Sequence, residues 1–275
     1  MSVDFSLFRL RFSFQAEERV HFAPMAANTL RGAFGYALRE THGEEFEAIF
    51  APSATAGHPS GLADSPRPFV FRCAHLDGAI LGPGAPFSVD VHLFETRRPL
   101  AGVFADAFRA MGQWGIGKGS GRATLSAVDE IALNLPLVAV AAPVHAASID
   151  FLTPTELKFA AQAAPEPLFP ALFARVRDRI STLRALYGAG PLAVDFRGLG
   201  ERAREVRMIS SRIRFVEVTR RSSRTGQVHP IGGFVGSAAY EGPLAEFLPW
   251  LQAASFTGVG RQTTWGKGEI RVKAQ

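Results

Sequence analysis

One order of predicted elements occurs twice along this chain. The first half begins with apolar and polar residues in alternation, the period of a strand, and continues with a helical stripe, two strands, a second helix and a strand pair. The second half restarts near residue 148 in the same order. Strand, helix, strands, helix and strand is the order of the ferredoxin-like module. We therefore expect an α+β chain of two tandem ferredoxin-like (RRM-like) domains, at residues 1–140 and 148–275, with a linker over 136–147.

The individual elements follow from periodicity, turn residues and helix-capping residues. In the first half we expect strands at 5–14, 69–72 and 87–94, helices from Asn28 or Thr29 to about 42, at 44–50 and at 100–111, a glycine-rich loop at 112–121 and a strand pair within 122–133. In the second half we expect strands at 148–159, 208–220 and 234–240, helices at 168–187 and 242–253, and two short final strands around a second glycine loop.

The charge of the chain is unevenly distributed. It holds 30 Lys and Arg against 25 Asp and Glu, a formal net charge of +5. Residues 175–275 contain 17 basic and 8 acidic residues, whereas residues 1–174 contain 13 and 17. This asymmetry indicates a second half that binds a polyanion. Of the basic residues 26 are Arg, which contacts phosphate in bidentate fashion and stacks on bases. A GC-rich genome would explain the excess of Arg equally well, but not its clustering.

Arginines concentrate on a predicted hairpin. Residues 197–224 hold nine Arg and three acidic residues, and no acid balances the tip. A basic hairpin of this kind can follow an RNA backbone or enter the deep groove of an A-form stem. A solvated charged face is the alternative. We expect RNA contacts from five of these side chains: Arg212, Arg214, Arg220, Arg221 and Arg224.

A glycine loop near the C-terminus is the second candidate RNA site. Two Gly-x-Gly pairs are separated by five residues that include a positive charge. Glycines allow close approach of an anion to the backbone, and exposed N–H groups beside cations can hold phosphate. The expected RNA-binding residues of this loop are Gly258, Gly260, Arg261, Gly266, Lys267 and Gly268.

Several other classes of site are not indicated. A single cysteine, Cys73, excludes an internal disulfide and a multi-cysteine zinc site, and none of the seven His has zinc-motif spacing. Residues 112–119 nearly fit the P-loop spacing, but Gly119 replaces the Ser or Thr that would hold magnesium. We expect no cofactor and no metal. The N-terminus has no signal-peptide layout and the longest apolar run is shorter than the ~20 residues of a membrane helix, so we expect a cytoplasmic protein without membrane contact.

Residues 232–242, the run Leu248–Leu251 and the glycine loop together look like one family's C-terminal domain. The sequence resembles the CRISPR-associated RNA-processing endoribonucleases of the RAMP (repeat-associated mysterious protein) superfamily. The family pattern is Gly-hydrophobic-Gly, five residues with Lys or Arg, then Gly-hydrophobic-Gly, and Lys267 departs from it. The segments 30–35 and 86–87 resemble the first domain of that family, so the likeness covers nearly the whole chain.

The resemblance implies two ferredoxin-like domains and cleavage of precursor CRISPR RNA within its repeats, without metal. In such a reaction the 2′-OH of the RNA attacks the adjacent phosphorus and leaves a cyclic phosphate. A base, an acid and nearby cations assist. The family enzyme can remain bound to its crRNA product. The implied partners are a repeat stem-loop RNA and other CRISPR effector-complex subunits. The alternative is a non-catalytic RAMP subunit that binds crRNA in an effector complex.

The family often places its acid or base on or just after the first helix, so we expect His42 in this role. On a helical wheel Arg31 lies about 20° from His42 and Arg39 about 60° further round, so we expect both arginines to stabilise charge. Tyr36 points elsewhere on the wheel and is a weaker candidate. An exposed helix-end histidine without a catalytic role, and catalysis by arginines alone, both stay open.

Overall fold

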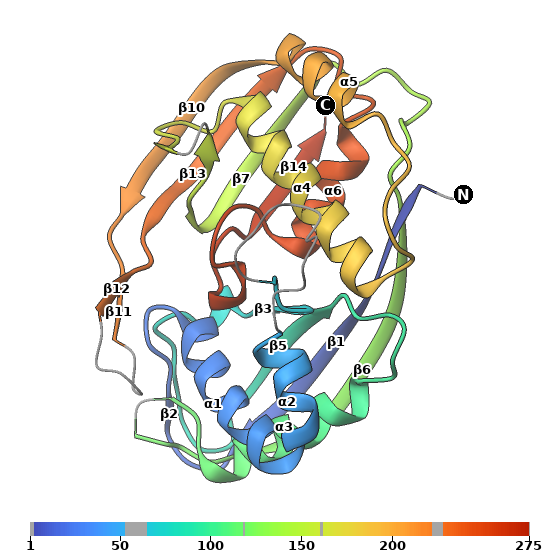
Figure 1. Cartoon of the computed structure of the whole chain (residues 1–275). Coiled ribbons are helices and arrows are strands. Elements are labelled where there is room, and N and C mark those ends of the chain that lie inside the picture. The colour runs from blue at the N-terminus through green and yellow to red at the C-terminus, as the bar shows by residue number, and fades with distance from the viewer. Residues whose placement is uncertain (1–2, 53–64, 118, 160–161, 222–227, 275) are drawn as a thin grey trace.

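Two four-stranded antiparallel sheets form the framework of the molecule, and helices cover one face of each (Figure 1). The computed structural model describes residues 3–52, 65–117, 119–159, 162–221 and 228–274. In the described part of the chain, no helix combines the length and the apolar character that crossing a membrane requires.

The first sheet has the order β3-β5-β1-β6. Its four strands are β1 (Asp4–Ala16), β3 (Phe69–Arg72), β5 (Pro86–Leu93) and β6 (Ala123–Pro136). Its helices are α1 (Ala26–Thr41), α2 (Gly43–Phe50) and α3 (Ala101–Trp114). Two small strands, β2 (Val20–His21) and β4 (Ile80–Leu81), pair beside it, and a 3-10 turn covers Ala74–Leu76.

The second sheet has the equivalent order, β10-β13-β7-β14. Its strands are β7 (Ala146–Thr155), β10 (Arg207–Val216), β13 (Gly233–Glu241) and β14 (Ile270–Ala274). Its helices are α4 (Phe169–Tyr187), α5 (Phe196–Arg202) and α6 (Leu248–Thr257), with 3-10 turns at Ala203–Glu205 and Thr263–Trp265. Two minor hairpins complete it: β8 (Lys158–Phe159) with β9 (Gln162–Ala163), and β11 (Thr219–Arg221) with β12 (Val228–Pro230).

Both halves therefore contain strand, helix, two strands, helix and strand, with the first strand between the third and the fourth. This confirms the predicted pair of ferredoxin-like folds. The domain limits at 140 and 148 stay predictions, since β6 ends at Pro136 and β7 begins at Ala146.

Strand β1 contributes side chains to the cores of both halves. Leu10, Phe12 and Phe14 point to the core formed with α1 and α3. Phe5 and Leu7 belong instead to the core of the second half. Successive side chains of a strand point to opposite faces, so one strand can serve two cores. The two halves are therefore joined by buried apolar contacts as well as by the chain.

Three predicted elements differ from the structure. The strand pair within 122–133 is one strand, β6, which pairs with β1 along its whole length with a single register shift. The helix predicted at 242–253 begins at Leu248, with Pro249 in its first turn, where proline is tolerated. This helix, α6, continues to Thr257, so a helix and not a strand precedes the glycine loop.

Candidate functional site

The glycine loop, residues 258–268, connects α6 to β14. All four of its Gly-x-Gly glycines have positive φ. At two of them a side chain would also collide with the backbone: a Cβ on Gly268 would lie 1.9 Å from the Val259 oxygen, and one on Gly260 would lie 2.3 Å from the Glu156 oxygen. These positions require glycine, because only glycine adopts this conformation without a Cβ penalty.

A buried ion pair holds the loop from inside. Lys267 is fully buried, and its Nζ donates to the Gly232 oxygen (2.7 Å), to Gln262 Oε1 (3.1 Å) and to Glu156 Oε2 (3.2 Å). Burial lowers the pKa of Lys267, and its bond to Glu156 counteracts this. Burial also opposes ionisation of Glu156, but bonds from Arg261 and Lys267 outweigh it and lower the pKa of that carboxyl.

The two cations of the loop therefore differ in role. Arg261 is half exposed and its Nη1 donates to Glu156 Oε1 at 2.9 Å, so it remains accessible to a phosphate. The geometry does not favour the predicted RNA contact of Lys267, because its ammonium is enclosed and already has three acceptors. Lys267 instead fixes the shape of the loop.

The loop is packed against the first helix. Figure 1 shows the segment before β14 beside α1. A Cβ on Gly266 would lie 2.5 Å from the Ala27 Cβ, and the Arg31 guanidinium lies 5.7 Å from the centre of the Trp265 ring. The same guanidinium lies 4.5 Å from the centre of the Phe50 ring of α2. Arg31 is therefore buried between α2 and the glycine loop.

The three predicted catalytic residues do not form one cluster. At about 1.5 Å per residue, Arg31 and His42 are separated by about 16 Å along the helix axis, which a helical wheel does not show. Helix α2 also folds back over this side of α1 and covers Arg31. Arg39 is exposed and lies over two rings, Tyr36 at 5.9 Å and Phe46 at 5.8 Å. The structure thus places Arg31 apart from the other two, and the catalytic roles of all three residues stay predictions.

His42 occupies the junction between α1 and α2, and its side chain is partly exposed. Its Nε2 lies 3.2 Å from Asp106 Oδ2 on α3. Asp106 also accepts a hydrogen bond from Arg109 Nη1 at 2.7 Å. A carboxylate in this position holds an imidazole in one orientation. Sequence reasoning missed Asp106, because nothing in the sequence relates residues 64 positions apart.

An exposed aromatic pair lies beside Arg39. Tyr36 of α1 and Trp114 at the end of α3 are 54% and 48% exposed, and their ring centres are 5.6 Å apart. Large exposed aromatic side chains next to a cation are typical of surfaces on which nucleic-acid bases stack. For Tyr36 the signal in the sequence was the apolar stripe of its helix, which leaves this residue outside it. Trp114 lies in line with the apolar stripe of α3, so helical periodicity did not predict its exposure.

The basic hairpin is formed by the predicted strands. Arg212 and Arg214 are exposed on β10, opposite Ser237 and Val235 of β13. The backbones of Arg220 and Arg221 belong to β11. The side chains of these two residues, and the whole of Arg224, lie outside the described part of the chain.

Two further predictions concern the glycine-rich loop of the first half and the binding of a metal ion. The N-terminal glycine loop follows a helix that extends to Trp114, and a Cβ on Gly117 would lie 2.3 Å from the His21 oxygen, so this loop packs on β2. Among the described residues, no three His, Cys, Asp or Glu side chains gather in an arrangement that could hold a metal ion.

Solved structures with this fold include Cas6 proteins. A Cas6 product complex is 19% identical with a TM-score of 0.60, covering 98% of this chain and 100% of that one. Thermus thermophilus Cas6 is 17% identical with a TM-score of 0.59, covering 99% and 100%. A partial Cas6-RT-Cas1–Cas2 complex is 10% identical with a TM-score of 0.61, covering 98% and 46%. None of the curated proteins matches the chain by sequence.

Protein-family models match both halves. Residues 5–143 match an N-terminal domain model designated AF_1859_N, and residues 149–270 match the model of the CRISPR-associated endoribonuclease Cas6. The second match contains the glycine loop and both strands of the basic hairpin. Together with the tandem ferredoxin-like folds, these matches show that the chain belongs to the Cas6 family of CRISPR-associated endoribonucleases.

Proposed function

We propose that this chain cleaves precursor CRISPR RNA within its repeats, without a metal ion, and remains bound to the crRNA product. The observation that carries the proposal is the glycine loop of the Cas6-matching half, which is fixed by Lys267 and packed on α1 of the other half. The proposal is also supported by solved relatives of this fold, which include a Cas6 product complex and a Cas6 substrate mimic complex.

The chemistry uses a nucleophile that the RNA itself carries. The 2′-OH loses its proton to a base and attacks the adjacent phosphorus, the bond from phosphorus to the 5′ oxygen breaks, and an acid protonates that oxygen. The products are a 2′,3′-cyclic phosphate and a 5′-hydroxyl. Cations that approach the phosphate stabilise the extra negative charge of the transition state.

His42 is the proposed acid or base. It is accessible, and Asp106 holds its ring from the side of α3. One solved Cas6 with this fold, 20% identical with a TM-score of 0.54, is a variant in which a histidine is replaced by alanine. Arg39 is the proposed charge-stabilising cation, because it is exposed one helical turn before His42. Arg31 is buried, so we assign it to the attachment of the glycine loop.

The RNA-binding surface in this proposal combines backbone and arginine contacts. The repeat stem-loop lies along Arg212, Arg214 and the β11–β12 hairpin, and the glycine loop receives phosphates through its backbone and through the exposed Arg261. The exposed rings of Tyr36 and Trp114 stack on unpaired bases near the cut site. Other subunits of a CRISPR effector complex are further proposed partners.

Incubation of the pure protein with a structured repeat RNA in EDTA tests the proposal. We expect one cut per repeat with a cyclic phosphate end, and a complex of protein with product that survives gel filtration. Intact RNA that binds tightly would contradict cleavage and would favour a non-catalytic crRNA-binding subunit.

A further inference from the structure

A cavity lies on the side of the glycine loop that faces α4. We name it the glycine-loop cavity; its volume is about 360 Å³. Four cationic side chains and two carboxylates contribute to its wall: Lys158, Arg175, Arg179, Arg261, Glu156 and Asp178. Positive charge therefore exceeds negative charge in this cavity.

Both carboxylates of the cavity already have cationic partners. Glu156 accepts from Arg261 at 2.9 Å and from the buried Lys267 at 3.2 Å. Asp178 accepts from Arg175 at 2.9 Å and from Arg177, outside the cavity, at 3.0 Å. Within the described residues, neither carboxylate nor any other acid lies within ion-pair distance of Lys158 or Arg179. Two cations of the cavity thus have no acidic partner there.

Arg179 is held in place but incompletely bonded. Its Nε donates to the Thr257 oxygen at the end of α6 at 2.9 Å. Its Nη2 is buried and has no hydrogen-bond partner among the described residues, and the same holds for Nε of Arg175. Burial, and then the charge of Arg72, lower the pKa of Arg179 to about 9. A buried donor on a cation is costly unless an acceptor, best an anion, meets it.

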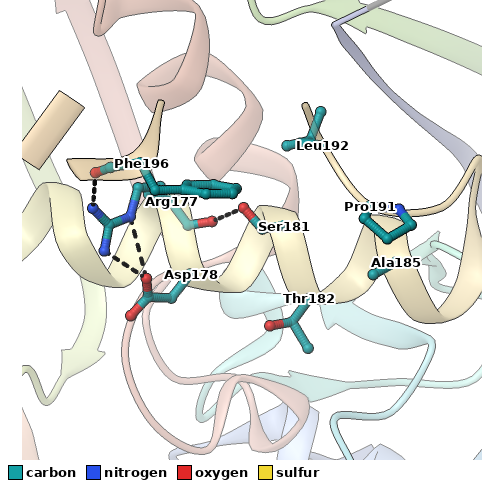
Figure 2. Close-up of a pocket in the computed structure, with 8 residues that line it drawn as sticks. All are labelled: Arg177, Asp178, Ser181, Thr182, Ala185, Pro191, Leu192 and Phe196. Atoms are coloured by element: carbon teal, nitrogen blue, oxygen red, sulfur yellow. Dashed lines mark hydrogen bonds and ion pairs between the residues drawn. The ribbon is translucent and has the colours of Figure 1, made fainter. Parts of the chain in front are cut away.

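A neighbouring cavity on α4 provides a contrast. Figure 2 shows this Phe196 cavity, lined in part by Arg177, Asp178, Ser181 and Phe196. There Arg177 donates from Nη1 to the Phe196 oxygen at 2.8 Å and from Nη2 to Asp178 Oδ1 at 3.0 Å. The cation of the Phe196 cavity is therefore satisfied within the protein, whereas Arg179 of the glycine-loop cavity is not.

We propose that the glycine-loop cavity binds a phosphate group, with Lys158, Arg175 and Arg179 as its cationic ligands. Phosphate supplies both the negative charge and the acceptor oxygens that Arg179 Nη2 lacks. The cavity has room for a ribose and base attached to the phosphate. A phosphate held here joins α4 to the end of α6 and steadies the start of the glycine loop. The site is separate from the α1 surface at which we place cleavage.

Calorimetric titration of the full chain tests the site without any cleavage. Inorganic phosphate and AMP are the probes at constant ionic strength, with sodium chloride and adenosine as controls. We expect phosphate and AMP to bind with a dissociation constant of about 1 mM or below. Substituting both Arg175→Gln and Lys158→Gln should weaken binding at least about tenfold, because charge-assisted hydrogen bonds are lost. The matched change Arg177→Gln, two residues along α4 from Arg175 and in the Phe196 cavity, should leave it unchanged.

Competition with a repeat RNA identifies the source of the phosphate. If an RNA phosphate occupies the cavity, saturating AMP displaces the RNA and the double variant binds it more weakly. If a free nucleotide occupies the cavity, neither saturating AMP nor the double substitution changes the affinity for RNA. Either result supports the site. Failure of phosphate and AMP to bind at about 10 mM, or equal affinity of wild type and the double variant, overturns it.

Discussion

The two halves of the molecule use the same element of the same fold differently. In each, a glycine-rich loop follows the last helix, α3 or α6, and precedes the last strand. The loop at 115–121 packs on its own half, with Gly117 against His21 and Gly121 against Arg19. The loop at 258–268 reaches the other half, with Gly266 against Ala27, and contains a buried cation. Glycine content alone therefore does not identify a binding loop; what the loop packs against does.

The largest expected effect comes from the buried ion pair that distinguishes the C-terminal loop. Lys267→Met should destabilise the protein by about 3 kcal/mol, since Glu156 loses a buried partner. Lys273→Met is the matched control, because Lys273 is exposed and its pair with Asp150 should contribute less than about 1 kcal/mol. Urea unfolding measures both. Equal losses would mean that the buried pair does not set the loop apart.

Docking of the loop on α1 should have the next largest effect. Gly266→Ala places a methyl group 2.5 Å from the Ala27 Cβ at a φ of +88°, so we expect a loss of about 2–3 kcal/mol and weaker RNA binding. Gly119→Ala, at a φ of +92° with no atom within 4 Å, should cost only about 1–2 kcal/mol and leave RNA affinity unchanged. Thermal unfolding and RNA titration of the two variants separate backbone strain from lost docking.

The contact between the halves should also depend on pH. Burial, and then the charge of Arg72, lower the pKa of His92 to about 3, against a bond to the Phe256 oxygen that raises it. The unfolded state binds the His92 proton below about pH 6.5, so the contribution of His92 to stability falls as the pH is lowered. The difference in unfolding free energy between wild type and His92→Gln should shrink by about 2–3 kcal/mol from pH 7 to pH 4.5.

The comparison of wild type with His92→Gln also cancels an opposing pH dependence, which comes from Asp77. Burial raises the pKa of Asp77 to about 6, and this carboxyl takes up its proton in the folded state first, which favours folding as the pH falls. Asp77 is present in both proteins, so its contribution cancels. A difference that is constant with pH would show that His92 is not buried as a neutral group.

The smallest expected effect concerns the basic strand. Arg212→Gln with Arg214→Gln should reduce the slope of the logarithm of RNA affinity against the logarithm of salt concentration by about 1–2, because fewer counterions are released. Arg122→Gln in the first half should not change that slope, since Arg122 is paired with Glu18. Filter binding at several salt concentrations measures both variants. Equal slopes for all three proteins would remove β10 from the RNA interface.

The strands and helices that depend on short-range periodicity could be predicted from the sequence. The alternation in β1 and the stripe of α4 gave the strands, helices and tandem folds. The start of α1 at Ala26 was not predictable, because its cap is the carboxylate of Asp77, which accepts from the Ala26 N–H from a distant part of the chain. The prediction of α6 began too early for a related reason, since residues 242–247 form a turn that is held by contacts with other segments.

For the candidate site, the sequence predicted the types of residue but not which of them are buried. A helical wheel gives the angle of each side chain, but the burial of Arg31 depends on α2 and on Trp265, which the wheel omits. The same limit applies to Lys267, whose three acceptors come from separate segments. Whether a charge faces solvent or holds a loop is decided by tertiary packing.

The account depends most on the claim that the RNA supplies its own nucleophile at the α1 surface. The most direct test is single-turnover cleavage of one repeat RNA in EDTA, with either ribose or a single 2′-deoxyribose at the nucleotide before the cut. We expect cleavage of the first RNA, no cleavage of the second, and the same affinity for both. Cleavage of the deoxyribose substrate at a comparable rate would contradict the account.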